Sequence, residues 1–139
     1  MILALCAPGA MGAAAVQSDV SASVTGLRSH KGQVLACLTT NPQVFPNCDK
    51  DPSARKLTVP ATGDVKLDFG PVPEGRYAIS LVHDENGNGK LDTALMIPRE
   101  GFGFSRDAPV RMGPPRFDKA AFDVGAENTR MAIKMRYLL

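Results

Sequence analysis

The residues best suited to chemistry in this chain lie in one short run, HDENGNGKLDT, at residues 83–93. Oxygen-bearing side chains recur at alternate positions from the start of this run. Hard cations such as Ca²⁺ bind oxygen ligands, and a glycine at the sixth position of a calcium loop permits the sharp turn that lets alternate side chains converge. Counted from Asp84, that glycine is Gly89. The predicted calcium ligands are Asp84, Asn86, Asn88, Lys90 through its carbonyl, and Asp92. We place His83 and Thr93 beside the ion as supporting residues.

The match to a calcium loop is incomplete at its end. An EF-hand has a bidentate Glu at the twelfth position, where this chain has Leu95. We therefore expect weak binding, with a dissociation constant on the order of 10⁻⁴–10⁻³ M, as in extracellular modules. The same residues also fit a turn that needs no ion, because Asn-Gly occurs twice in four residues and Asp or Asn side chains cap such turns. The sequence leaves both interpretations open.

An enzymatic interpretation starts from the same run. His83, Asp84 and Asp92 are the residue types of a metal-assisted hydrolase. A single His at the end of a strand is more often a hydrogen-bonded structural residue. The sequence also has no Gly-x-Ser-x-Gly elbow, no HExxH, no phosphate-binding glycine loop and no cysteine pair at zinc spacing. A non-catalytic protein is the preferred interpretation.

Charge and composition exclude one large class of partner. The chain of 139 residues has 16 Lys and Arg against 14 Asp and Glu, a net charge of +2, and so lacks the strongly basic surface that phosphate neutralisation requires. No nucleic acid is expected as a partner. Basic residues do gather between residues 99 and 119, interleaved with acidic ones, which is typical of a solvated surface and also allows a shallow anion or glycan site. These basic residues are Arg99, Arg106, Arg111, Arg116 and Lys119.

The N-terminal residues predict export. Residues 1–16 are uncharged, and three alanines ending at Ala15 suit cleavage by a signal peptidase. We therefore assign residues 1–18 to a signal peptide and residues 19–139 to one domain, periplasmic or secreted, with no transmembrane segment in the mature chain. The signal lacks the usual positive first segment, so either it is truncated or the stretch is an apolar tail.

The cysteine count is consistent with cleavage by a signal peptidase near Ala15. Cleavage near Ala15 removes Cys6 and leaves Cys37 and Cys48 as an even pair. In an oxidising compartment we expect these two to form a disulfide that closes the proline-rich segment between them. Two unpaired thiols are the alternative.

Alternation of apolar and polar residues predicts about seven short strands, and no amphipathic helix follows residue 18. The strands are expected near residues 20–27, 34–38, 57–59, 65–69, 77–82, 121–124 and 131–135. Many short strands with frequent turn residues indicate an antiparallel β-sandwich. Residues 93–118 are too long and too rich in Gly and Pro for an ordinary connection, yet contain Phe102 and Phe104. We expect one long ordered loop here, docked on an end or edge of the sandwich.

Three blocks between residues 82 and 122 resemble a known family. They read VHDENGNGKLDT, IPREGFGFS and GPPRFDKAAF, and they are similar to the hallmark blocks of DUF2141, a family of bacterial exported proteins. The upstream segment FGPVPEGRYAISLVHD also resembles the Gly-x-Tyr strand of transthyretin-like and carboxypeptidase-regulatory-type sandwiches. The resemblance implies a small Ig-like or prealbumin-like (transthyretin-like) β-sandwich in the periplasm or outside the cell. It implies no enzymatic activity.

The sequence as a whole predicts an exported, non-catalytic binding or accessory module of the bacterial cell envelope, with calcium as its cofactor. Its partner would be an envelope protein or a glycan of unknown identity. One alternative is a structural spacer whose turn is self-capped and holds no ion. The other is the hydrolase that uses His83, Asp84 and Asp92.

Overall fold

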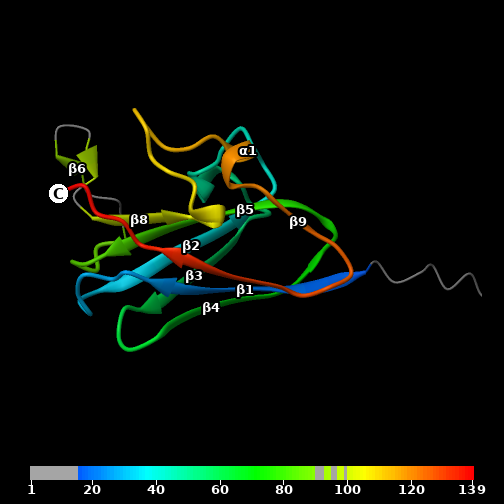
Figure 1. Cartoon of the computed structure of the whole chain (residues 1–139), viewed down its shortest axis with the longest axis horizontal. Helices are drawn as coiled ribbons and strands as arrows, with labels where there is room; N and C mark the ends of the chain where they lie inside the picture. Colours follow the sequence, from blue (N-terminus) through cyan, green and yellow to red (C-terminus); the bar gives the residue numbers. More distant parts are fainter. Residues whose placement is uncertain (1–15, 90–92, 95–96, 99) are drawn as a thin grey trace, which may run out of the picture.

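The chain folds into two β-sheets packed face to face (Figure 1). The computed structural model describes residues 16–89, 93–94, 97–98 and 100–139. The predicted signal peptide falls almost wholly outside these residues, as do Lys90, Leu91 and Asp92. The all-β class predicted from the sequence is confirmed.

The first sheet has three strands in the order β10-β1-β4. Its centre is β1 (Gln17–Thr25), which pairs antiparallel with β4 (Val65–Pro73). On its other side β1 pairs in parallel with β10 (Thr129–Lys134). The prediction of an antiparallel sandwich is wrong for this one pair, because the first and last strands run in the same direction. This pairing joins strands about a hundred residues apart, so no local pattern in the sequence indicates its direction.

The second sheet follows the order β3-β2-β5-β8. It contains β3 (Arg55–Pro60), β2 (Gln33–Thr39), β5 (Gly75–Asp84) and β8 (Gly101–Phe104), all antiparallel. A short strand, β9 (Phe122–Val124), pairs with the first three residues of β5. The strand β5 is therefore the long central element, and its residues 79–81 are almost fully buried.

The main core lies between the two sheets and is built from the inward side chains of alternating strands. In β4, for example, Val65, Leu67 and Phe69 are buried and the intervening Lys66 and Asp68 are exposed. This is the period-two pattern from which the strand was predicted. All seven predicted strands are present, as β1, β2, β3, β4, β5, β9 and β10.

The strand β8 was not predicted, because its sequence GFGF was assigned to the long loop. Its two phenylalanines and two glycines nevertheless alternate between opposite faces. A Cβ on Gly101 would lie 2.5 Å from the ring of Tyr137, and one on Gly103 would lie 3.0 Å from the side chain of Ile133. Glycine is required here because the C-terminal segment crosses directly over this face of the strand.

The phenylalanines of β8 lie in a second hydrophobic cluster, separate from the main core. This cluster holds Phe102 and Phe104 with Phe45, and Phe117 packs against it. The part of the predicted loop after β8 is therefore docked on the sheet, as expected. It also contains a 3-10 turn at Ser105–Asp107 and the four-residue helix α1 (Phe117–Ala120). Two further short strands, β6 (Thr93–Ala94) and β7 (Ile97–Pro98), pair with each other.

The two sides of the sandwich differ in closure. On one side, Phe102 of β8 and Arg136 exchange two backbone hydrogen bonds of 3.0 and 2.8 Å, so the sheets are joined there. On the other side, β3 and β4 are the edge strands of different sheets and no ladder connects them. The sandwich is thus closed along β8 and open between β3 and β4.

The predicted disulfide is present between Cys37 of β2 and Cys48. It closes the connection from β2 to β3, which also contains a 3-10 turn at Cys48–Lys50. Both cysteines are buried.

Candidate functional site

The predicted calcium loop begins at the last residue of β5. The register of β2 and β5 places Gln33 opposite Asp84, so the loop emerges beside the start of β2. The turn before β2 presses against it closely. A Cβ on Gly32, whose φ is +68°, would lie 2.0 Å from the backbone oxygen of Asp84. Only glycine fits at this point of contact.

The side chain of Asp84 is at the centre of the described part of the loop. It is 0% exposed, and its oxygens accept hydrogen bonds from the backbone amides of Asn88 at 3.2 Å and Gly89 at 2.7 Å. The side-chain amide of Gln33 donates a third bond, at 3.0 Å, from β2. The backbone therefore winds tightly around this carboxylate, and Gly87 and Gly89 adopt positive φ to allow it.

The other predicted ligands are only partly described. Asn86 lies in the same turn, where its side-chain oxygen accepts a bond of 3.2 Å from the amide of Asn88. Lys90 and Asp92 lie outside the described residues, and Thr93 is described only as part of β6. Among the residues that the structure describes, no three His, Cys, Asp or Glu side chains gather in a way that could hold a metal ion. In the described part of the loop, the side-chain oxygens of Asp84 and Asn86 both accept from the backbone amide of Asn88.

His83 precedes this carboxylate and belongs to a different set of contacts. It is 0% exposed, and its Nε2 lies 2.8 Å from the backbone oxygen of Lys31. Because a carbonyl only accepts, Nε2 carries the proton and Nδ1 of the neutral ring is an acceptor. The hydroxyl of Tyr137 lies 2.7 Å from Nδ1 and donates to it, while accepting the backbone N–H of Arg28 at 3.1 Å. Both ring nitrogens are thus used in packing three segments together.

A second set of polar contacts at this end was not predicted from the sequence. The guanidinium of Arg28 forms an ion pair with Glu85, the residue after Asp84, and its Nε lies 2.9 Å from the carboxylate. Ser29 donates to the other oxygen of Glu85 at 2.9 Å. Arg28 also lies over the ring of Tyr137, 4.4 Å from its centroid, and donates to the backbone oxygen of Leu139. These contacts tie the C-terminal residues to the start of the predicted calcium loop.

The electrostatics of this network follow from the ion pair and from burial. The hydrogen bond from Arg28 holds the pKa of Glu85 below its usual value, although desolvation acts against it. The same bond raises the pKa of Arg28. Burial raises the pKa of the Tyr137 phenol, which keeps its proton available for His83. No sequence signal could have indicated Tyr137, because it lies 54 residues from His83 and 109 from Arg28.

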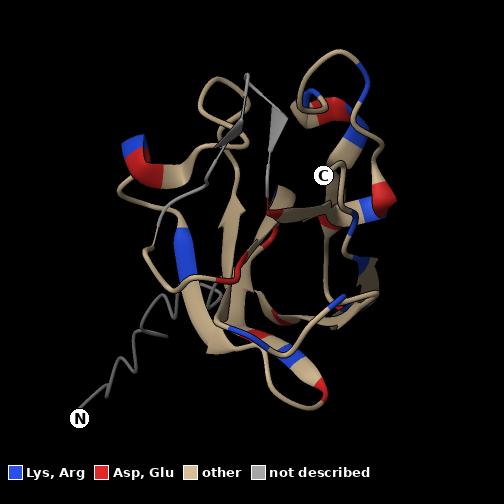
Figure 2. Ribbon diagram, turned by 90° about the vertical axis from the view of Figure 1, so that its left-hand side faces the viewer, with Lys and Arg blue, Asp and Glu red and all other residues tan. Residues whose placement is uncertain are grey.

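The basic residues near the long loop are interleaved with acidic ones along the chain. Lys and Arg are interspersed with Asp and Glu along the ribbon (Figure 2). Arg106 donates to the backbone oxygen of Ala121 at 3.4 Å, so at least one of them has a structural contact. Arg99 lies outside the described residues. Within the described ranges, no helix has the length and hydropathy needed to cross a bilayer.

The comparisons with known proteins give one result. No curated protein and no solved structure matches the chain significantly. The sequence model of one protein family, described as an uncharacterized protein conserved in bacteria (DUF2141), matches residues 22–132. This span runs from β1 to β10 and includes the loop around Asp84. The chain therefore belongs to the DUF2141 family.

Proposed function

We propose that this protein is an exported, non-catalytic binding or accessory module of the bacterial cell envelope, and that residues 84–92 bind Ca²⁺ weakly. The observation that carries the calcium proposal is the carboxylate of Asp84, taken together with the oxygen-bearing residues that follow it at alternate positions. The carboxylate is fully buried, and among the described residues its partners are three neutral amide groups, with no ion pair. Buried charges in proteins are normally paired with an opposite charge or coordinate a metal.

The loop around Asp84 has the composition that a weak calcium site requires. A carboxylate has about four lone-pair sites, and three amide donors leave one oxygen lone pair for a cation. Asn86 and Asn88 follow at alternate positions, and Gly89 supplies the sharp turn. Asp92 and the carbonyl of Lys90 complete the proposed ligand set, with His83 and Thr93 as neighbours. The lack of a twelfth-position carboxylate keeps the expected dissociation constant at about 10⁻⁴–10⁻³ M.

We also propose the finer fold assignment, an Ig-like or prealbumin-like (transthyretin-like) sandwich. One observation supports it. The hydroxyl of Tyr77, near the start of β5, donates to the backbone oxygen of Pro73 four residues upstream at 2.7 Å. This resembles the tyrosine corner of Ig-like sandwiches, where a Tyr at the crossing between two sheets bonds back to the preceding backbone. Here too, β4 and β5 belong to different sheets.

Export and the envelope location rest on two features. Residues 1–18 have the composition of a signal peptide, and disulfides persist mainly in oxidising compartments. The partner of the module would be an envelope protein or a glycan. Mass spectrometry of the mature protein tests the export proposal, since cleavage near Ala15 gives an N-terminus at Val16, and an intact N-terminus on protein recovered from the cytoplasm contradicts it.

The self-capped spacer remains the second candidate, because the amides of Asn88 and Gly89 already cap Asp84 without an ion. The hydrolase has less support. A catalytic His83 would need a free ring nitrogen facing a substrate, whereas both nitrogens are bonded to protein atoms.

A thermal melt in calcium separates the first two candidates. For a dissociation constant of 10⁻⁴–10⁻³ M, 10 mM calcium should stabilise the wild type by about 1.4–2.7 kcal/mol relative to EDTA. Asp84→Asn should remove this gain, and Asp64→Asn, which alters an exposed carboxylate elsewhere, should keep it. An equal concentration of Mg²⁺ should stabilise less, because it dehydrates reluctantly. An unchanged melting temperature of the wild type in 10 mM calcium would leave the spacer as the better account.

A further inference from the structure

A pocket lies at the open side of the sandwich, where β3 and β4 approach without pairing. Its volume is about 210 Å³. The residues that line it are Leu38, Thr40, Ser53, Arg55, Val72, Pro73 and Tyr77. Pockets for larger ligands measure roughly 300–1,000 Å³, so this one suits a small molecule or a single side chain.

The floor of the pocket is apolar. Leu38 and Val72 are each 1% exposed and belong to the main core, as does Tyr77. The hydroxyl proton of Tyr77 is committed to the oxygen of Pro73, so the ring rather than the hydroxyl donor is what Tyr77 offers a ligand. Because Leu38 and Val72 are almost fully buried, a hydrocarbon group placed here would contact mainly Pro73, which is exposed, and the ring of Tyr77.

The rim of the pocket is polar and carries one charge. Among the described residues of the lining, Arg55 is the single charged one and none has a carboxylate. A guanidinium has five N–H donors, and within the described residues Arg55 uses one of them, from Nη1 to the backbone oxygen of Phe69 at 3.2 Å. Thr40 and Ser53 add exposed hydroxyl groups beside it. Burial raises the pKa of Tyr77, and the positive charge of Arg55 acts to lower it. The charge of Arg55 therefore acts on a residue of the pocket floor.

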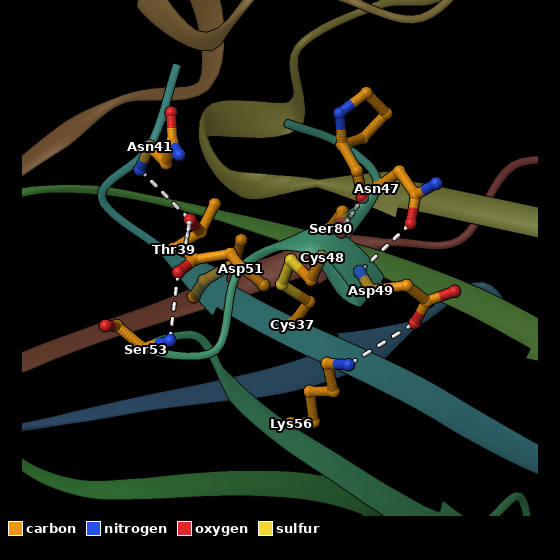
Figure 3. The surroundings of a disulfide bond; sticks show 12 residues. Cys37, Thr39, Asn41, Asn47, Cys48, Asp49, Asp51, Ser53, Lys56 and Ser80 are labelled. Atoms are coloured by element: carbon orange, nitrogen blue, oxygen red, sulfur yellow. Dashed lines mark hydrogen bonds and ion pairs between the residues drawn. A yellow bond between two sulfur atoms is a disulfide. The ribbon is translucent and has the colours of Figure 1, made fainter. Parts of the chain in front are cut away.

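The polar rim is held in place by buried contacts. The carboxylate of Asp51 accepts the hydroxyl of Thr39 at 2.6 Å and the backbone N–H of Ser53 at 2.9 Å (Figure 3). The disulfide between Cys37 and Cys48 fixes the same segment to β2. Thr40 follows Thr39 in the chain and the backbone of Ser53 takes part in these contacts, so they hold the backbone of the rim in place.

We propose that this pocket binds the carboxylate of a small organic acid, with Arg55 on the anion and the hydrocarbon part against the apolar floor. A guanidinium and a carboxylate form charge-assisted, often bidentate hydrogen bonds, and the adjacent hydroxyls can donate two more. The inference rests on the proposed function only in treating the domain as a binding module. It does not require calcium at the 84–92 loop.

The test is a titration of the ¹⁵N-labelled full chain, with its disulfide intact, followed by amide chemical shifts. Butyrate is the probe and butyramide, of the same shape but neutral, is its control. We expect butyrate to shift the amide signals of Ser53 and Arg55 saturably, with a dissociation constant of about 1–10 mM for so few atoms. Butyramide should bind at least tenfold more weakly. The affinity for butyrate should be the same in calcium and in EDTA, so a failure of this proposal can be distinguished from a failure of the calcium proposal.

Two variants locate the site. Arg55→Gln should weaken butyrate binding at least tenfold, since hydrogen bonds to a charged group are lost. Lys56→Gln removes the same charge from the next position of β3, whose side chain is on the opposite face and pairs with Asp49 at 3.3 Å, and it should leave binding unchanged. If Arg55→Gln fails to fold, the comparison of butyrate with butyramide on the wild type still decides whether the pocket recognises a carboxylate.

Four outcomes would overturn the proposal. They are the absence of a saturable shift by 50 mM butyrate, equal shifts with butyramide, an unchanged affinity in a folded Arg55→Gln, or an equal loss in Lys56→Gln. A dipeptide with a free C-terminus, compared with its amide, distinguishes the source of the carboxylate. Stronger binding by the dipeptide than by butyrate would identify a peptide end as the better ligand, and it would replace the free acid in the proposal.

Discussion

The strand pair β2 and β5 has polar residues at both ends, and the two ends are held together by different means. At one end Gln33 faces Asp84, and at the other Thr39 faces Ala78. Near the first end, hydrogen bonds and an ion pair join Arg28, Glu85 and Tyr137. Near the second, a disulfide closes the connection and Asp51 is bonded within it.

Each end of the strand pair also contains a buried carboxylate. Asp51 accepts a hydroxyl and a backbone amide inside a covalently closed loop. Among the described residues Asp84 accepts only from amides, and the contacts of its loop to the rest of the chain are noncovalent there. A buried carboxylate is therefore not by itself a sign of a metal. The calcium proposal needs the additional oxygen ligands that follow Asp84, and it predicts that the ion affects one end of the strand pair and not the other.

The largest expected effect comes from removing the covalent link. Replacing Cys37 and Cys48 together by Ala should lower the free energy of unfolding by about 3 kcal/mol, because the closed loop restricts the unfolded chain. Urea denaturation measures this loss. A reductant should produce a similar loss in the wild type and none in the double variant. If the double variant is as stable as the oxidised wild type, the disulfide does not stabilise its end of the strand pair β2 and β5, and the contrast between the two ends fails.

Two matched Tyr→Phe changes compare the noncovalent contacts at the two ends. Tyr137→Phe should cost about 1–3 kcal/mol, because it leaves the buried Nδ1 of His83 without a donor. Tyr77→Phe should cost about 0.5–1.5 kcal/mol, because it removes one hydrogen bond to a backbone oxygen. Chemical denaturation of both variants gives the two values. The absence of a measurable loss of stability in Tyr137→Phe would mean that its hydroxyl does not act as a link between segments.

The smallest expected effect concerns the ion pair of Arg28 with Glu85. The pKa of Glu85 is lowered in the folded state, so its charged form stabilises the fold above the unfolded pKa of about 4.3, and this stabilisation is lost as the pH falls through the folded pKa. The side chain of Arg28 is 40% exposed, so we expect only about 0.2–1 kcal/mol. Glu85→Gln should be less stable than the wild type at pH 7 and nearly equal to it at about pH 3. A difference that persists unchanged at the lower pH would show that the effect is not electrostatic.

The sequence was sufficient to predict the features that repeat locally. Alternation of apolar and polar residues located seven strands, and the count of cysteines indicated the disulfide. The strand β8 was missed because Gly101 and Gly103 were interpreted as loop residues. Glycine is needed at these positions because Tyr137 and Ile133 pack directly against the strand. These contacts join residues 30 or more positions apart and leave no local pattern.

Only part of the predicted site lies among the described residues. The sequence identified Asp84 and Asn86, whose spacing is local, and these do lie in one tight turn. It could not identify the contacts of Arg28 with Tyr137 or the pocket beside Arg55, because both depend on how distant strands pack. Such sites follow from the sheet order and not from the spacing of residues along the chain.

The most direct test of the account is a calcium titration of the ¹⁵N-labelled protein that follows both ends of the strand pair at once. We predict saturable shifts of the amides of Asn88 and Gly89, which donate to Asp84, at a dissociation constant of about 10⁻⁴–10⁻³ M. The amide of Ser53, which donates to Asp51, should not move and serves as the internal control. Asn88 and Gly89 signals that stay fixed up to 20 mM calcium, or that move no more than the signal of Ser53, would contradict the central claim.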